Sequence, residues 1–155
     1  MNNNDLDRIL FVSSSGGVLL ELLALKPWWS KYQIAWAVVE APDTLSALAG
    51  EKRYWIGNTS FRRPFRILLD FFTAWRILRT ERPQLIVSAG SGPAISFFAV
   101  ARLLGIPTFW IHTLNILATP GVSAKICARL SSRVFLQQKS MLSAHPEGVF
   151  IGELY

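Results

Sequence analysis

Residues 8–17 have the sequence RILFVSSSGG, and residues 84–94 have the sequence QLIVSAGSGPA. In each stretch a short apolar run leads into small residues and glycines, and an apolar helical pattern follows. Strand, tight turn and helix in this order are typical of the units that build a parallel sheet with helices on both faces. We therefore predict an α/β fold, a Rossmann-like parallel sheet covered by helices on both faces.

Short strand patterns alternate with longer helical patterns along the rest of the chain. Strands are expected at residues 8–13, 33–39, 53–56, 84–88, 108–111, 133–136 and 149–151. Helices are expected at residues 17–25, 44–49, 61–79, 94–104, 122–130 and 139–144. Because no internal repeat or low-complexity linker interrupts this alternation, we expect a single domain over residues 8–155, preceded by a polar stretch at residues 1–7.

The composition is that of an apolar domain with little metal-binding chemistry. The chain has 155 residues, of which 51% are hydrophobic, with one cysteine and two histidines. Cys127 has no partner for an intramolecular disulfide, so we expect a reducing cytoplasmic compartment and no metal or other cofactor. Residues 1–7 lack the basic and apolar segments of a secretion signal. Residues 83–101 and 103–124 are uncharged and long enough to span a bilayer, but glycines and prolines break both, so no transmembrane helix is expected.

Two loops are candidate anion sites. Each follows an expected strand, so its backbone N–H groups and the N-terminus of the next helix can hold a phosphate. In the second loop, glycines allow close backbone approach and Pro93 is set for the first helical turn. The candidate phosphate contacts are Ser14, Ser15, Gly16, Gly17, Gly90, Ser91 and Gly92. On a parallel sheet the two loops would face one crevice, although small residues at such turns can also serve tight geometry alone.

Neither loop matches a nucleotide-binding motif. Val18, Leu19 and Leu20 follow Gly16-Gly17, so the G-x-G-x-x-G order is absent, and no G-x-x-x-x-G-K-[ST] occurs. This disfavours an NAD-dependent enzyme or an NTPase. Glu40 and Asp43 follow the second expected strand, where an acid can contact a ribose, but the glycine motif that accompanies such a contact is absent.

The positive charge is concentrated in one region. Of the sixteen lysines and arginines, eight lie within residues 52–82, and the net charge is +6. The helix expected at 61–79 places cations beside an apolar stripe of Phe65, Leu68, Phe72 and Trp75. Such a helix can lie on anionic lipid, although the stripe can equally be core and the arginines a solvated face. The candidate membrane contacts are Arg62, Arg63, Phe65, Arg66, Phe72, Trp75 and Arg76. Trp28 and Trp29, beside Lys26 and Lys31, form a second candidate interfacial spot.

Nucleic acid is the other partner that a basic protein suggests. The sequence has no zinc-finger spacing, no RNA-recognition aromatic motif and no evident helix-turn-helix context. We therefore do not expect a nucleic-acid partner.

Several short segments, in order and spacing, resemble one enzyme family. They are SSGG at 14–17 with Glu21-Leu22 on the next helix, SAGSGPA at 88–94, LLGIP at 103–107, SAK at 123–125 and VFIG at 149–152. Over nearly the whole chain they resemble the acceptor-side, membrane-associated subunit of bipartite UDP-sugar glycosyltransferases. That family includes the N-acetylglucosaminyltransferase of eukaryotic N-glycan assembly and, more particularly, bacterial capsule and exopolysaccharide relatives.

The resemblance implies a fold, partners and a location. The domain would be equivalent to the N-terminal half of a GT-B glycosyltransferase and would form a heterodimer with a separately encoded donor-binding subunit. That partner would hold most of the UDP-sugar, while this subunit recruits a polyprenyl-diphosphate-linked sugar. The resemblance places it as a peripheral protein at the cytoplasmic face of the inner membrane. It further implies inverting transfer without a metal, and inactivity of this subunit alone.

Two departures from the family pattern affect the candidate catalytic residues. The first loop of the family usually continues Gly-Gly-His, but this chain has Val18, so no base comes from that position. After the fifth strand the family commonly has Glu-Ser, whereas this chain has His112-Thr113. His112 is thus the candidate general base, since an imidazole titrates near neutral pH, with a purely structural histidine as the alternative. Thr113 is a further candidate substrate contact.

Glu21 and His145 are two further ionisable residues. Glu21 either orients the first loop or is an ordinary acid favoured by the helix dipole. His145 is expected in a surface turn, without a role.

Two other function classes remain open at this stage. One is a self-sufficient Rossmann nucleotide-binding enzyme, which would bind nucleotide tightly by itself. The other is a non-catalytic membrane scaffold, which would bind lipid without affecting the turnover of a partner.

Overall fold

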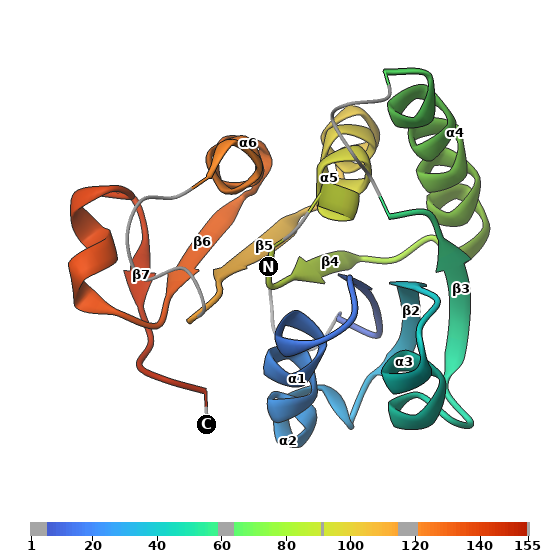
Figure 1. Ribbon diagram of the computed structural model, residues 1–155, viewed down its shortest axis with the longest axis horizontal. Coiled ribbons are helices and arrows are strands. Elements are labelled where there is room, and N and C mark those ends of the chain that lie inside the picture. Colours follow the sequence, from blue (N-terminus) through green and yellow to red (C-terminus); the bar gives the residue numbers. More distant parts are fainter. Residues whose placement is uncertain (1–5, 59–63, 91, 115–120, 155) are drawn as a thin grey trace.

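The computed structural model describes residues 6–58, 64–90, 92–114 and 121–154. Seven strands form one sheet in the order β3-β2-β1-β4-β5-β6-β7 (Figure 1). The strands are β1 (Arg8–Ser13), β2 (Gln33–Val39), β3 (Lys52–Ile56), β4 (Leu85–Ser88), β5 (Thr108–His112), β6 (Arg133–Leu136) and β7 (Val149–Phe150). Every neighbouring pair is parallel. The predicted Rossmann-like parallel sheet is confirmed.

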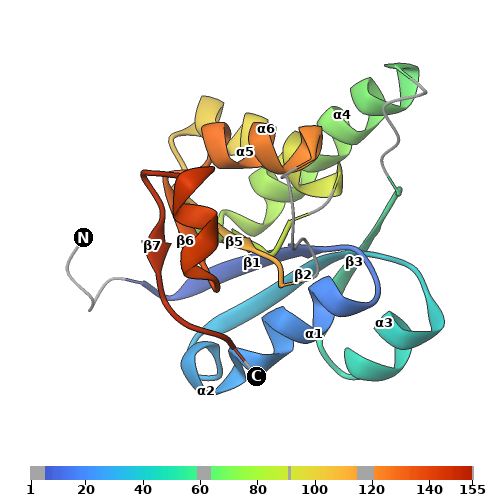
Figure 2. The same cartoon turned by 60° about the vertical axis from the view of Figure 1, so that its left-hand side comes forward.

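Helices cover both faces of this sheet (Figure 2). On one face lie α1 (Gly17–Ala24), α2 (Lys26–Trp29) and α3 (Pro42–Ala47). On the other lie α4 (Pro64–Glu81), α5 (Gly92–Leu104) and α6 (Val122–Leu130). A 3₁₀ helix, η1 (Lys139–Ser143), joins β6 to β7.

Each face of the sheet has its own hydrophobic core. Along β1, Leu10 and Val12 pack into the cluster beneath α4, α5 and α6, whereas Ile9 and Phe11 pack into the cluster beneath α1 and α2. Because successive side chains of a strand point to opposite faces, a strand covered on both sides is apolar throughout. This explains the continuous apolar run ILFV at residues 9–12.

Local signals set the ends of the helices. Pro42 occupies the first turn of α3, where its fixed φ suits the helix, and the Thr44 hydroxyl accepts the Ala41 N–H at 2.9 Å. Gly105, with a φ of +69°, follows α5, and the Ile106 N–H donates to the Ala101 carbonyl at 2.9 Å. A left-handed glycine in this place ends a helix at little cost.

The observed elements differ from the expected ones at several boundaries. Helix α2 was not expected, and its Pro27 lies in the first turn, where proline is tolerated and its fixed φ suits the helix. Helix α3 starts at Pro42 instead of residue 44, again with the proline in its first turn. Helix α4 runs over Pro64–Glu81 rather than 61–79, and residues 61–63 lie outside the described residues. Within the described ranges, no helix combines the length and apolar character that a membrane crossing requires.

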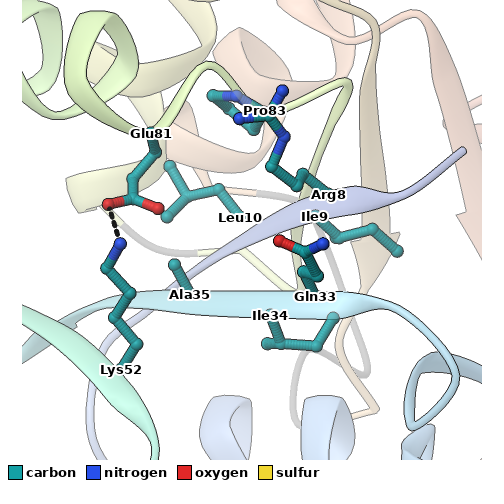
Figure 3. A pocket seen from close by; sticks show the side chains of 9 residues that line it. All are labelled: Arg8, Ile9, Leu10, Gln33, Ile34, Ala35, Lys52, Glu81 and Pro83. Atoms are coloured by element: carbon teal, nitrogen blue, oxygen red, sulfur yellow. Dashed lines mark ion pairs between the residues drawn. The ribbon is translucent and has the colours of Figure 1, made fainter.

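A small pocket lies at the amino ends of the first strands (Figure 3). Its lining includes Arg8, Gln33 and Lys52, the first residues of β1, β2 and β3, together with Glu81 from the end of α4. Lys52 Nζ lies 2.7 Å from Glu81 Oε1, which also accepts the Tyr54 hydroxyl. Burial acts to raise the pKa of Glu81, but the hydrogen bonds from Lys52 and Tyr54 outweigh it and bring the pKa below its usual value. The pair fastens strand β3 to α4, at the edge of the sheet opposite the candidate loops.

Candidate functional site

The candidate site lies where the order of the strands reverses. Strands β1 and β4 are neighbours, β2 and β3 continue from β1 to one side, and β5 to β7 continue from β4 to the other. Phe11 pairs with Val87, so the carboxyl ends of β1 and β4, Ser13 and Ser88, lie at the same edge. Open parallel sheets bind ligands in the crevice at such a switch point. Both predicted loops follow these two strands, and Ser91 lies outside the described residues.

The first loop contacts an acid of its own chain. Gly16 has a φ of +79° and caps α1, and its N–H donates to Asp43 Oδ2 at 2.6 Å. The Ser14 hydroxyl donates to the Ser15 carbonyl at 3.3 Å. A phosphate that uses the Gly16 N–H must therefore displace Asp43, while Gly17 begins α1. The sequence indicated an acid after the second strand but not this contact.

The second loop lies over buried polar atoms. Gly90 has a φ of +99°, and a Cβ added there would lie 3.5 Å from Trp110 Nε1. The Trp110 Nε1 and Ser88 Oγ atoms are buried, with no hydrogen-bond partner in the described part of the chain. Helix α5 starts at Gly92, so its N-terminus is at the same edge. Buried donors without partners, beside a helix N-terminus, favour a polar ligand at this loop.

His112 ends β5, as the sequence indicated, but its side chain is only 2% exposed. Its ring lies 5.4 Å from Trp110 and 5.7 Å from His145, centroid to centroid. Burial, followed by the charge of His145, lowers the pKa of His112 below its usual value, so the imidazole is neutral at pH 7. A general base must contact the proton that it removes. The neutral form suits the predicted general base, whereas the burial of the ring counts against it.

His145 begins a turn, as expected, since its carbonyl accepts the Gly148 N–H at 2.9 Å, but the expected surface position is wrong. Its side chain is 4% exposed and its ring centroid lies 5.5 Å from that of Trp110. The sequence could not show this, because the rings of Trp110 and His112, which contact His145, lie on β5, more than thirty positions earlier in the chain.

Thr113 and Glu21 contact each other instead of solvent. The Thr113 hydroxyl donates to Glu21 Oε1 at 2.6 Å, and the Leu114 N–H donates to the same oxygen at 3.0 Å. Gln137 Nε2 donates to Glu21 Oε2 at 3.0 Å. Burial raises the pKa of Glu21, and the hydrogen bonds from Thr113, Leu114 and Gln137 act in the opposite direction. The hydroxyl expected to contact substrate is therefore bound to a fully buried carboxyl group.

Glu21 fits neither of the two roles that the sequence suggested. Its hydrogen-bond partners in the described part of the chain, Thr113, Leu114 and Gln137, all lie outside the first loop, and it is 0% exposed, unlike an ordinary helix-dipole acid. One signal in the sequence was available: Glu21 is the single acid in the leucine-rich helix α1. An isolated acid on an apolar helix face needs buried partners. Gln137, one of those partners, gave no signal at all.

The predicted apolar stripe of α4 is exposed over much of its length. Phe65 is 84% exposed, Leu68 57% and Phe72 62%. The alternative that this stripe is simply core is therefore wrong for these three residues. Trp75, by contrast, is half-buried against the core, and the Arg79 guanidinium lies 5.3 Å from its ring centroid.

The cations of this region are only partly described. Arg66 and Arg76 are exposed on α4, whereas Arg62 and Arg63 lie outside the described residues. In the second candidate interfacial spot, Trp28 and Trp29, one of the two aromatic residues is buried. Trp29 is 3% exposed, and its Nε1 donates to the Leu22 carbonyl at 2.9 Å. Trp29 is thus a core residue.

Curated proteins similar in sequence to this chain align with it over only part of their own length. No protein-family model matches it. It is 34% identical over 89 residues to the UDP-N-acetylglucosamine--N-acetylmuramyl-(pentapeptide) pyrophosphoryl-undecaprenol N-acetylglucosamine transferase of Nitrosospira multiformis, a match that covers 57% of this chain and 24% of that protein. The protein of the same name from Oceanobacillus iheyensis is 26% identical over 163 residues, covering 95% of this chain and 44% of its own length. The chain thus spans less than half the length of these curated relatives.

Solved structures of other proteins contain the same fold over most of this chain. The crystal structure of MurG from Acinetobacter baumannii superposes with a TM-score of 0.72 at 20% identity, over 85% of this chain and 42% of that one. A UDP-N-acetylglucosamine 2-epimerase from Rickettsia bellii superposes with a TM-score of 0.74 at 14% identity, over 96% of this chain and 45% of that one. At these identities the likeness establishes the fold alone. The chain has the Rossmann-like fold of the N-terminal half of a GT-B glycosyltransferase.

Proposed function

We propose that this chain is the acceptor-side part of a UDP-sugar glycosyltransferase that acts on a polyprenyl-diphosphate-linked acceptor at a membrane surface. The observation that carries the proposal is the alignment of 95% of the chain with 44% of a relative whose name specifies transfer of N-acetylglucosamine to a pyrophosphoryl-undecaprenol-linked acceptor. The GT-B half-fold agrees with this assignment. The structural likeness to epimerases does not weigh against it, since it is a likeness of fold.

The second loop is the stronger candidate for the diphosphate. Gly90, the start of α5 at Gly92 and the buried Trp110 Nε1 bring backbone and side-chain donors to one place. Donors and a helix N-terminus together favour an anion. In the first loop, the Gly16 N–H can contribute only after Asp43 leaves it.

Helix α4 is the proposed membrane contact. Phe65, Leu68, Leu69 and Phe72 are each more than half exposed, and exposed arginines lie beside them on the same helix. Exposed apolar side chains next to cations are typical of helices that lie on anionic lipid. This would place the protein peripherally at the cytoplasmic face of the inner membrane.

We further propose that the donor-binding part is a separately encoded subunit, and that the complex is an inverting enzyme of capsule or exopolysaccharide synthesis. The resemblance of the glycine loops and the 88–94 segment to the bipartite family supports this. The UDP-sugar would then be held mainly by the partner. His112 stays the predicted general base, with its burial as the observation against it.

The test is sugar transfer from radiolabelled UDP-sugars to a membrane lipid fraction. The assay compares this chain alone, the candidate partner encoded in the adjacent region alone, and the two combined. Transfer only by the combination supports the two-component enzyme. Transfer by this chain alone contradicts the need for a partner. Absence of transfer with all common UDP-sugars, together with tight nucleotide binding by this chain, favours a self-sufficient nucleotide-binding enzyme instead.

A further inference from the structure

Glu21 joins three parts of the chain that are far apart in the sequence. It lies on α1, the helix that follows the first loop, and its side chain is 0% exposed. Its carboxyl group receives hydrogen bonds from Thr113 and Leu114, directly after β5, and from Gln137, directly after β6. These residues all lie at the carboxyl edge of the sheet, which carries the candidate site.

The orientation of the Gln137 carboxamide is fixed by two backbone groups. Its Nε2 donates to the His112 carbonyl at 3.1 Å, and its Oε1 accepts the Leu154 N–H at 3.1 Å. In the reversed orientation the Gln137 NH₂ group would face the Leu154 N–H, and the Gln137 oxygen would face the His112 carbonyl and Glu21 Oε2. Gln137 must therefore present a donor to Glu21 Oε2.

The other oxygen of Glu21, Oε1, faces a backbone N–H, which cannot act as an acceptor. The Leu114 backbone N–H lies 3.0 Å from Glu21 Oε1 and can only donate. Both oxygens of residue 21 must thus accept hydrogen bonds. A carboxylate has lone pairs on both atoms, whereas a carboxamide has them on one, so glutamine cannot replace Glu21 without placing two buried donors against each other.

We infer that Glu21 is a positioning residue, whose two oxygens hold the backbone after β5 directly and the backbone at Leu154 through Gln137, in one arrangement at the edge of the candidate site. Its effect on turnover rests on the proposed function, whereas the contacts themselves do not. Glu21 is fully buried, so it acts through the backbone that it holds and not by touching substrate.

Three variants separate this role from a general loss of stability. Glu21→Gln keeps the size of the side chain and places a donor against a donor. Thr113→Val keeps the volume and removes only the hydroxyl. Glu51→Gln is the matched control, because Glu51 lies in the turn before β3 at the opposite edge of the sheet. Circular dichroism and thermal unfolding identify the folded fraction of each variant.

The first readout is amide hydrogen exchange followed by NMR, which needs no activity. In Glu21→Gln we expect at least one of the Leu114 and Leu154 amides to exchange at least roughly tenfold faster, because the carboxamide oxygen can face only one of the two sides, while the amides of β1 keep their protection. In Thr113→Val the Leu154 amide should keep its protection, because Gln137 still holds it. Unchanged exchange at both amides in folded Glu21→Gln would overturn the inference.

The second readout is turnover by the complex, corrected for the folded fraction. We expect kcat of Glu21→Gln to fall by roughly tenfold to a hundredfold with the KM for the UDP-sugar unchanged, since small misplacements at a site cost this much. Wild-type kcat in folded Glu21→Gln would mean that Glu21 is structural only and would overturn the inference. If the wild-type complex transfers no sugar, the proposed function fails by itself, and the exchange measurement alone decides whether Glu21 positions the edge.

Discussion

Arg82 occupies the left-handed region of backbone conformation directly after α4, with a φ of +47°. A residue with a Cβ pays about 1–2 kcal/mol in this region, and glycine does not. We expect Arg82→Gly to raise the free energy of unfolding by about 0.5 kcal/mol or more, less than the full strain because glycine also gains freedom in the unfolded chain. Urea denaturation measures the change. The same exchange at Arg76, inside α4, should lower stability by about 1 kcal/mol, and a loss in both variants would contradict strain at Arg82.

The buried imidazole of His112 makes stability depend on pH. Burial, followed by the charge of His145, depresses the pKa of His112 in the folded protein, so below about pH 6.5 the unfolded chain binds a proton that the folded chain does not. Stability is therefore complete above that pH and is lost as the pH falls. Of the two rings, that of His145 also lies close to Glu147, whose Oε1 is 3.7 Å from His145 Nδ1.

We expect His112→Asn to reduce the slope of unfolding free energy against pH between about pH 7 and 5, because asparagine does not titrate. Urea denaturation at several pH values gives the slope. A slope identical to that of the wild type would show that the imidazole is not held neutral in the folded state.

At the scale of residues, sequence reasoning found the positions but not the partners. Gly16, Gly90, Gly92 and His112 lie where the pattern indicated, because loops after parallel strands meet at one edge. The partners of Glu21 lie 92 and 116 residues further along the chain. Periodicity within a window of ten to twenty residues carries no information on such contacts, so the buried acid network could not be predicted.

At the scale of elements, most strands and helices followed from the apolar pattern. Strands β1, β2 and β6 and helix α6 have the expected bounds to the residue, since apolar runs there end at polar or small residues. The main miss was α2, where Lys26-Pro27-Trp28-Trp29 has too few residues for any helical period to show. The expected last helix is a 3₁₀ turn, η1, which a 3.6-residue pattern does not distinguish over five residues.

Helix α4 carries a prediction of its own. If its exposed apolar side chains enter lipid, Phe65→Ser together with Phe72→Ser should weaken binding to anionic vesicles at least roughly tenfold, because each buried phenylalanine contributes about 1.5–3 kcal/mol. Co-sedimentation with vesicles of phosphatidylglycerol and phosphatidylethanolamine measures the partitioning.

The matched control for this helix is Leu20→Ser. Leu20 is 60% exposed on α1, on the other face of the sheet. Binding should be unchanged in this variant. Equal losses in Leu20→Ser and in the double variant would contradict a specific membrane contact at α4.

At the scale of the whole molecule, the strand order is what makes the candidate site. Adjacent strands β1 and β4 send their helices to opposite faces of the sheet, and this is the arrangement at which open parallel sheets bind ligands. The alternation of strands and helices predicts the parallel sheet, but not which strands lie side by side. The preference for right-handed crossovers reduces the number of possible strand orders, and packing between segments distant in the sequence selects one of them.

Cys127 offers a measure of how cooperatively this architecture opens. It is fully buried on α6, in the core cluster shared with α4 and α5, and burial raises the pKa of its thiol to about 12. Since the thiolate is the reactive form, labelling by a disulfide reagent at pH 8 should be at least roughly a thousandfold slower in the native protein than in urea-unfolded protein. Because α4, α5 and α6 share one core, we expect the labelling rate to rise with urea as steeply as global unfolding does. Rapid labelling that is independent of urea would instead show that α6 opens alone, and the face of the sheet beneath it would then be a separate unit of stability.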